Sequence, residues 1–301
     1  MTGAAPAVES APAVVAGGTS LWADAWGRLR RNRVAVVGGA VLALIILLCA
    51  LLPAMLGLDP KANDLAHHGM APSGAHVFGT DNLGRDYFAR VLVGGQTSLL
   101  VGLVATLVSV LIGTFWGAVA GYYGGFLDDL MMRVVDFLYA IPYMFLVILI
   151  MLLFQESARG SALPVFAALG AVQWLTMARI VRGQVIGLRH QEFVLAARTM
   201  GAGDARILVR HILPNCLGPI IVYATLTVPA VILLESALSY LGLGVELSWG
   251  GLVAEGVAIV NPIQQDWWLL LFPSLFLAAT LLSLNFLGDG LRDALDPRTR
   301  R

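Results

Sequence analysis

The residues with the clearest chemical layout lie in one charged stretch between long apolar segments. From Arg179 to Asn215 the chain contains no membrane-spanning run, and it carries six arginines. Ala196 and Ala197 offer a helix surface of low relief that fits a groove. Gly201 permits a positive φ, which would end this short helix and turn the chain. Pro214, after Leu213, fixes the angle at which the chain returns to the membrane. This layout predicts a surface that docks another protein.

The docking surface is assigned to nine residues of this stretch: Glu192, Ala196, Ala197, Arg198, Gly201, Arg206, Arg210, Leu213 and Pro214. Its three arginines can pair with acidic groups on a partner. A bulky residue at Ala197 or Gly201 should therefore leave membrane insertion intact and abolish function. The alternative is a solvated basic loop that serves only membrane topology.

Glu235 is a second candidate, because it is an acidic residue deep within an apolar segment. An ionisable group there is costly unless it faces protein or water. It either lines a water-filled path through the membrane or pairs across an interface near its outer end, or it forms an ordinary ion pair or hydrogen bond at the outer rim. The sequence leaves these readings open.

The segment Phe78–Tyr87 contains turn residues and charges. Gly79 and Gly84 indicate tight turns. Three residues can form local ion pairs: Asp81, Arg85 and Asp86. The segment either contacts another protein outside the membrane or is a self-contained folded loop.

The histidines and cysteines do not predict a metal site. His67, His68 and His76 lie near acidic residues and could bind a metal, but their spacing fits no compact site. Cys49 and Cys216 are far apart, so they form neither a disulfide framework nor a ligand cluster. We therefore expect no metal and no cofactor.

Composition places the chain in a membrane. Hydrophobic residues make up 58% and charged residues 13%, with zero formal net charge and a mean hydropathy of +0.81. The charge balance gives no indication of nucleic-acid binding. The one lysine, Lys61, stands in Asp-Pro-Lys-Ala, so the chain lacks the Gly-Lys-Ser/Thr of a nucleotide-binding P-loop. We expect that the chain is not itself an enzyme.

Six apolar segments are long enough to cross a bilayer as helices, so the fold should be an all-α bundle: 34–57, 97–122, 131–154, 161–181, 217–242 and 267–288. Residues 1–19 are expected to be disordered, 58–96 periplasmic and 289–301 a cytosolic C-terminus. Residues 97–288 would form the core, with the loop 179–215 on the cytosolic side.

Residues 20–33 should form an amphipathic helix at the cytosolic interface. Trp22, Trp26 and Leu29 recur at helical spacing with arginines between them. The alternative is an ordinary basic anchor with incidental tryptophans.

Arginine distribution predicts the orientation. Of 19 lysines and arginines, only Lys61, Arg85, Arg90 and Arg159 fall outside when the N-terminus is cytosolic, which leaves fifteen inside. This bias predicts six spans with both termini in the cytoplasm.

The second segment carries small residues at intervals of four, which let a neighbouring helix approach closely: Ala105, Ser109, Gly113, Gly117 and Gly121. We interpret this row as a packing surface, within the chain or against a partner subunit.

The charged stretch resembles the signature loop of type I ABC importer permeases. That signature is Ala-Ala, three residues, Gly, nine residues and Ile-x-Leu-Pro, and it matches here from Ala196 to Pro214. Two positions depart from it, Leu195 in place of Glu and His211 in place of Ile. FGTDNLGRDYFARVLVGGQTSL (78–99), ESALSYLGLG (235–244) and LGDGLRDALDPR (287–298) resemble the C-type subunit of dipeptide and oligopeptide importers. The resemblance covers about residues 20–298.

This resemblance implies a six-span importer permease of the inner membrane that passes di- or oligopeptides. The implied partners are a B-type permease in a heterodimer, two ABC ATPase subunits and a periplasmic or lipid-anchored solute-binding protein. The loop would be the coupling helix that docks into the ATPase. Nickel and glutathione importers use the same subunit type, so the cargo stays open. Residues 289–301 would lie near the ATPase or be a simple charged helix end.

Two other classes of membrane protein fit less well. A secondary transporter would show inverted repeats and a chain of intramembrane ionisable groups. A membrane-embedded enzyme would need a catalytic constellation such as His-Glu-x-x-His. The sequence shows neither pattern.

Overall fold

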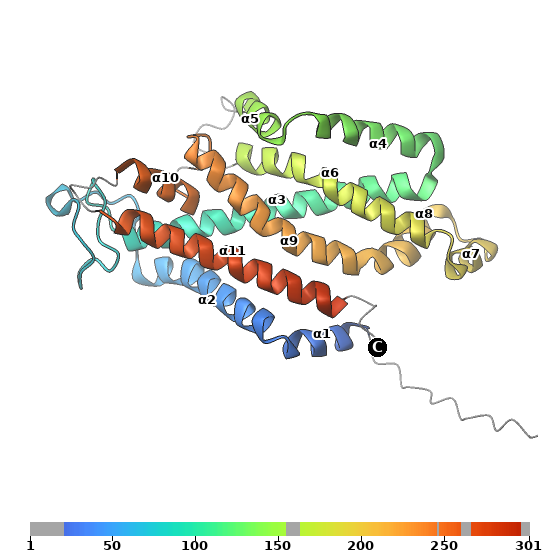
Figure 1. Cartoon of the computed structure of the whole chain (residues 1–301), viewed down its shortest axis with the longest axis horizontal. Helices are drawn as coiled ribbons and strands as arrows, with labels where there is room; N and C mark the ends of the chain where they lie inside the picture. The colour runs from blue at the N-terminus through green and yellow to red at the C-terminus, as the bar shows by residue number, and fades with distance from the viewer. Residues whose placement is uncertain (1–20, 155–162, 246, 260–265, 296–301) are drawn as a thin grey trace, which may run out of the picture.

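The computed structural model describes residues 21–154, 163–245, 247–259 and 266–295, and in them the chain is a bundle of long helices (Figure 1). The predicted disordered segment 1–19 lies outside these residues. The helices are α1 Leu21–Arg31, α2 Arg33–Leu56, the 3-10 turn η1 Leu65–His67, α3 Tyr87–Tyr123, α4 Gly125–Ala140, α5 Tyr143–Phe154, α6 Leu163–Leu188, α7 Glu192–Thr199, α8 Asp204–Ile207, the π-helical turn η2 Leu208–Ile212, α9 Leu213–Tyr240, α10 Trp249–Ile259 and α11 Trp268–Leu295.

Five helical runs are long and apolar enough to cross a membrane: α2, α3, α6, the run from Asp204 to Tyr240, and α11. A sixth span exists if α4 and α5 count together. The predicted all-helical membrane fold is therefore confirmed.

The third predicted span, 131–154, is not one straight helix. It is divided between α4 and α5, whose axes differ by 92°. The break lies at Ile141, which is extended (φ −83°, ψ 127°), and Pro142 follows it. A proline disfavours the helical conformation in the residue before it, and this explains the bend.

Several boundaries also move outward from the predictions. Helix α3 begins at Tyr87, so the end of the predicted periplasmic segment 58–96 is already helical. Helix α6 continues to Leu188, and a helical run resumes at Asp204. The non-spanning loop is thus shorter than 179–215. Helix α11 runs to Leu295, into the predicted cytosolic C-terminus.

The predicted row of small residues on α3 faces α6. Ala105 and Ser109 are fully buried. A Cβ atom added at Gly113 would lie 2.6 Å from the Met177 side chain, and one at Gly117 would lie 2.2 Å from the Ala178 carbonyl oxygen. The absence of side chains thus allows α3 and α6 to pack backbone to backbone.

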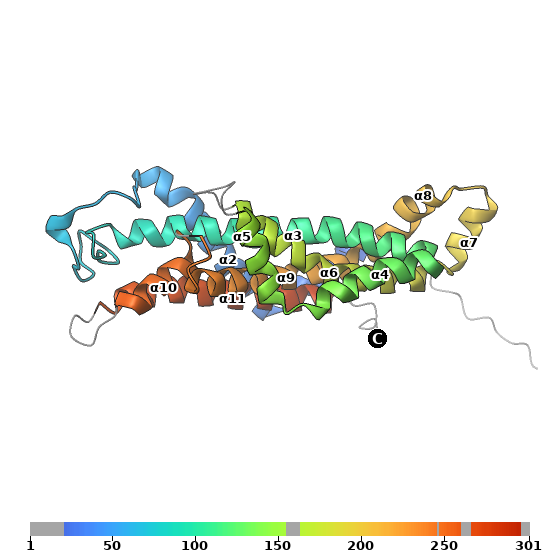
Figure 2. The same cartoon turned by 90° about the horizontal axis from the view of Figure 1, so that it is seen from above.

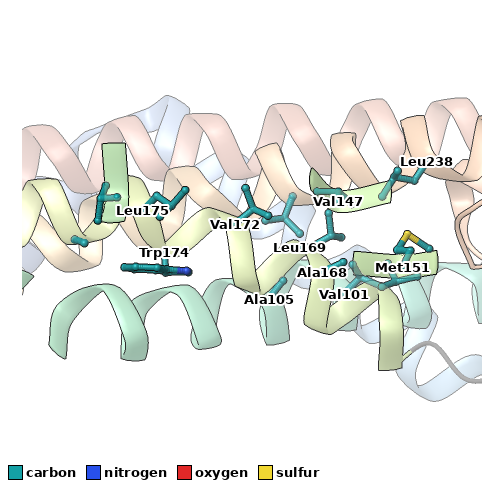
Figure 3. Close-up of a cluster of buried hydrophobic side chains, with 14 residues drawn as sticks. Val101, Ala105, Val147, Met151, Ala168, Leu169, Val172, Trp174, Leu175 and Leu238 are labelled. Carbon is teal, nitrogen blue, oxygen red and sulfur yellow. The ribbon is translucent and has the colours of Figure 1, made fainter. Parts of the chain in front are cut away.

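Apolar side chains of several helices fill the centre beside this contact. Figure 3 shows Trp174, Leu169 and Val172 of α6 among residues of α3, α5 and α9. Trp174 also packs edge-on against Trp116 of α3, with ring centroids 5.1 Å apart. The core therefore joins α3, α6 and α9 into one body.

We predict that Gly117→Ala destabilises the bundle by about 1–3 kcal/mol, because the new methyl group must push α3 and α6 apart. Thermal unfolding of the purified chain in detergent measures the effect. Gly183→Ala on α6 is the matched control, since a Cβ there meets no atom within 4 Å. Equal melting temperatures for the two variants would contradict this account of the packing.

Candidate functional site: a helical loop at one end of the bundle

Helix α7 projects beyond the ends of α3 and α4, and α8 lies next to it at the same end of the bundle (Figures 1 and 2). Helix α7 has eight residues, and Glu192 lies exposed in its first turn. A short turn at residues 189–191 connects it to α6. The loop is therefore a small folded unit at one end of the molecule.

Gly201 ends α7 as the sequence predicted. Its φ is +82°, in the left-handed region that favours glycine. The amide of Gly201 donates to the Arg198 carbonyl at 3.0 Å, and the amide of Ala202 donates to the Ala197 carbonyl at 3.1 Å. These bonds satisfy carbonyl groups at the end of the helix and reverse the chain.

Ala196 and Ala197 do not share one exposed surface, so this part of the prediction was wrong. Ala196 is exposed, whereas Ala197 is 2% exposed. Ala197 packs in a cluster with Val194, Ile207 and Ile212 of the same loop. Ala197 and Val194 lie on the side of α7 that packs on its own chain, and Ala196, about 100° around the helix from Ala197, lies outside that contact.

The outer side of α7 carries apolar side chains. Phe193 and Leu195 are 40% and 48% exposed, and Met200, directly after the helix, is 80% exposed. Ala196 lies among them in sequence and is also exposed. The unit thus presents an apolar surface, which we call the α7 face: Phe193, Leu195, Ala196 and Met200.

The loop is fastened to α3 by polar contacts. Tyr122, at the end of α3, donates its hydroxyl hydrogen to Oδ1 of Asp204 at 2.7 Å and accepts a bond from Nη2 of Arg198 at 3.2 Å. The bond to Tyr122 raises the pKa of Arg198. Arg189 donates to the carbonyl oxygen of Gly121 at 3.0 Å.

Arg198 therefore serves an internal contact, which the sequence did not predict. Arg206 and Arg210 are exposed, and neither forms a salt bridge within the described ranges. These two arginines retain the capacity to meet acidic groups of a partner.

Leu213 and Pro214 lie at the start of α9, where the chain was predicted to return to the membrane, within a helical run that already begins at Asp204. The run from Asp204 to Tyr240 is helical throughout, with a wider π-helical turn at Leu208–Ile212. Pro214 has no amide hydrogen for the carbonyl four residues earlier. A local π-turn accommodates this gap, and the amide of Leu213 bonds to Leu208 instead.

Glu235 is completely buried near the far end of α9. Its Oε1 accepts hydrogen bonds from Ser239 at 2.6 Å and from Ser248 at 2.7 Å. Ser248 also accepts a bond from the amide of Gly251 in the first turn of α10. The carboxyl group thus connects α9 to the beginning of α10, and its Oε2 has no partner among the described residues.

The segment before α3 is a folded cap at the end opposite α7. Gly79 and Gly84 have positive φ, which fits the tight turns predicted there. Asp81 pairs with Arg85 at 2.6 Å, which confirms a predicted ion pair, while Asp86 caps α3 through the amide of Ala89. Beside it, the hydrogen bond from His67 lowers the pKa of Asp64.

Arg90 forms a buried ion network that sequence reasoning missed. Its side chain is 3% exposed and binds Asp81 at 2.7 Å and Glu255 of α10 at 2.8 Å. Trp249 of α10 also donates its ring NH to the carbonyl oxygen of Val91 at 2.9 Å. These contacts join the cap, α3 and α10.

Two ion pairs between α4 and α6 were also not predicted. Arg182 binds Asp128 through two bonds of 2.6 and 2.7 Å. Arg179 binds Asp136 at 2.6 Å. Arg179 and Arg182 lie at the end of the predicted fourth span. Arginines at the end of an apolar helix require partners or water, so their positions indicated that ion pairs could form there.

Comparison with known proteins identifies the family. Residues 109–301 match the family described as binding-protein-dependent transport system inner membrane component, and residues 20–72 match the N-terminal transmembrane domain of oligopeptide transport permease C.

Three relatives cover nearly the whole chain. The oligopeptide transport system permease protein of Haemophilus influenzae is 46% identical over 94% of this chain and 90% of its own length. The Escherichia coli K12 protein of the same description is 47% identical over 94% and 93%. The dipeptide transport system permease protein of Bacillus subtilis is 43% identical over 92% and 86%. With its spanning helices and projecting loop, the chain belongs to the family of binding-protein-dependent transport system inner membrane components, as a multi-pass permease of the inner membrane.

Proposed function

We propose that this chain is one of two permease subunits in an ATP-driven importer of di- or oligopeptides. Its relatives carry the names of oligopeptide and dipeptide permeases over more than nine-tenths of this chain. The chain supplies half of the translocation pathway, and a related B-type permease supplies the other half. Two ABC ATPase subunits and an external solute-binding protein complete the complex.

The observation that carries this proposal is the α7 face. Water-exposed apolar side chains that project from the end of a bundle are typical of a protein-binding surface. Arg206 and Arg210 are exposed, form no salt bridge with another described residue, and add positive charge nearby. The chain has no P-loop of its own, so the nucleotide-hydrolysing subunit must be a separate protein.

The contacts of the loop suggest how force passes into the membrane. Movement of α7 would act on α3 through Tyr122 and Gly121, which bind Arg198, Asp204 and Arg189. Helices α3 and α6 pack backbone to backbone and would follow as one unit. Closure of the two ATPases would then tilt these helices.

The proposed orientation has both termini and α7 in the cytoplasm. The cap and Glu235 would lie near the external side. The buried bonds of Glu235 to Ser239 and Ser248 support a role in holding α10 at this end.

Co-purification tests the proposal. Affinity purification of the chain from its native membrane should recover a B-type permease and an ATP-hydrolysing subunit, with ATPase activity in the eluate. Recovery of the folded chain alone, without any ATPase, would overturn the proposal.

A further inference from the structure

Helix α4 has an exposed charged side that its packing does not explain. It packs on the bundle through residues that include Asp128 and Val135. On one exposed side it carries apolar residues, which include Leu130 and Phe137. On another it carries the charged residues Asp129, Arg133 and Asp136, all exposed and spaced by four and three residues. Exposed charges on a spanning helix face water or protein and not lipid.

The neighbouring side of α6 has the same character. Arg179 and Gly183 are exposed, and Gln173 and Thr176 are half-buried. Figures 1 and 2 both show α4 alongside α6, and the Asp136–Arg179 ion pair joins the two helices. The charged side of α4 and this polar side of α6 therefore form one continuous polar surface.

The Asp136–Arg179 pair at this surface is open to solvent. The side chains are 65% and 47% exposed, and Nη2 of Arg179 lies 2.6 Å from Oδ1 of Asp136. Within the described residues, Oδ2 of Asp136 and both Nε and Nη1 of Arg179 have no hydrogen-bond partner. Each side chain of the pair thus keeps polar atoms that are available to a ligand.

An aromatic contact fixes the guanidinium group. Its Cζ lies 4.0 Å from the centroid of the Tyr139 ring, a distance at which cation and ring attract. The Tyr139 hydroxyl in turn forms a hydrogen bond with Thr176 of α6. The guanidinium group of Arg179 is therefore held in place, while its side chain remains partly exposed to solvent.

We propose that Asp136 and Arg179 form a binding station for the charged ends of a peptide in the translocation pathway. The ammonium group of the peptide binds the free oxygen of Asp136, and its carboxylate binds N–H groups of Arg179 that Asp136 does not use. Every unmodified short peptide has both groups, so the station recognises peptides independently of sequence. This inference rests on the proposed function, because it places the polar surface along a peptide pathway.

Binding measurements on the purified complete complex, without the external receptor, test the station. The probes are radiolabelled dialanine, its N-acetyl derivative and its C-terminal amide. Arg179→Gln should weaken binding of the two probes with a free carboxylate about tenfold and leave the amide unchanged. Asp136→Asn should weaken the two probes with a free amine and leave the acetylated probe unchanged. Asp129→Asn, the same change on the same side of α4, should alter none of them.

Three results would overturn the station. One is an equal loss of binding of all three probes in both variants. Another is equal binding of free and blocked peptides by the wild type. The third concerns a lipid headgroup, since phosphatidylethanolamine carries the same pair of charges. If adding this lipid to nanodiscs lowers dialanine affinity tenfold or more, the headgroup occupies the site instead.

The parent proposal is judged separately on the same preparation. Co-purification of the ATPase supports it whether or not dialanine binds. A failed station with an intact ATPase complex therefore refutes only the station.

Discussion

Ala196→Trp on α7 should reduce ATP-driven peptide uptake by at least about tenfold while the chain still inserts and folds. Ala196 is exposed on the α7 face, so the indole ring has room in the isolated chain. In the complex the same ring would separate the α7 face from the ATPase. A loss of about 1.4 kcal/mol in binding free energy already weakens the affinity tenfold. Uptake into proteoliposomes and retention of the ATPase during purification measure the effect.

Gly74→Trp is the matched control, because a Cβ at Gly74 also meets no atom within 4 Å and the residue precedes α3 in the cap. Ala197 would be a poor choice for this test, since a larger side chain there disrupts the loop itself. Gly201→Trp adds backbone strain at φ +82° to its bulk. Normal uptake by the Ala196→Trp complex would show that α7 does not dock the ATPase.

Arg90→Gln should lower the free energy of unfolding by about 3–5 kcal/mol, the usual cost of removing one member of a buried ion network. The change leaves Glu255 without its partner and takes one cation from Asp81. Expression and thermal unfolding in detergent would register the loss.

Arg85→Gln provides the comparison, because Arg85 binds the same Asp81 but its side chain is 22% exposed. Its removal should cost much less, since solvent screens a partly exposed pair. A similar effect of the two substitutions would mean that the cap is not held by the buried network.

The spanning helices could be predicted from the sequence because apolar length alone specifies them in a bilayer. The broken third span could not be read from apolarity, although Pro142 carried the relevant signal. The continuous helix at Pro214 shows the opposite case, in which a proline sits near a helix start with a π-turn before it.

At the site, Gly201 was predictable because a positive φ is a property of one residue. The burial of Ala197 was not, since it depends on which side of α7 packs on Ile207 and Ile212. The contact of Arg198 with Tyr122 joins α7 to the distant helix α3, and Arg90 meets Glu255 from α10. Such long-range pairs depend on how the helices pack. Their residues have no characteristic spacing in the sequence, so sequence patterns do not predict them.

The most direct test of the coupling account compares peptide uptake by two sets of proteoliposomes. One set contains the permease pair with its ATPases and external receptor, and the other contains the permease pair alone. The account predicts peptide accumulation only in the first set and only with ATP. Concentrative uptake by the permease pair without ATPases would contradict it.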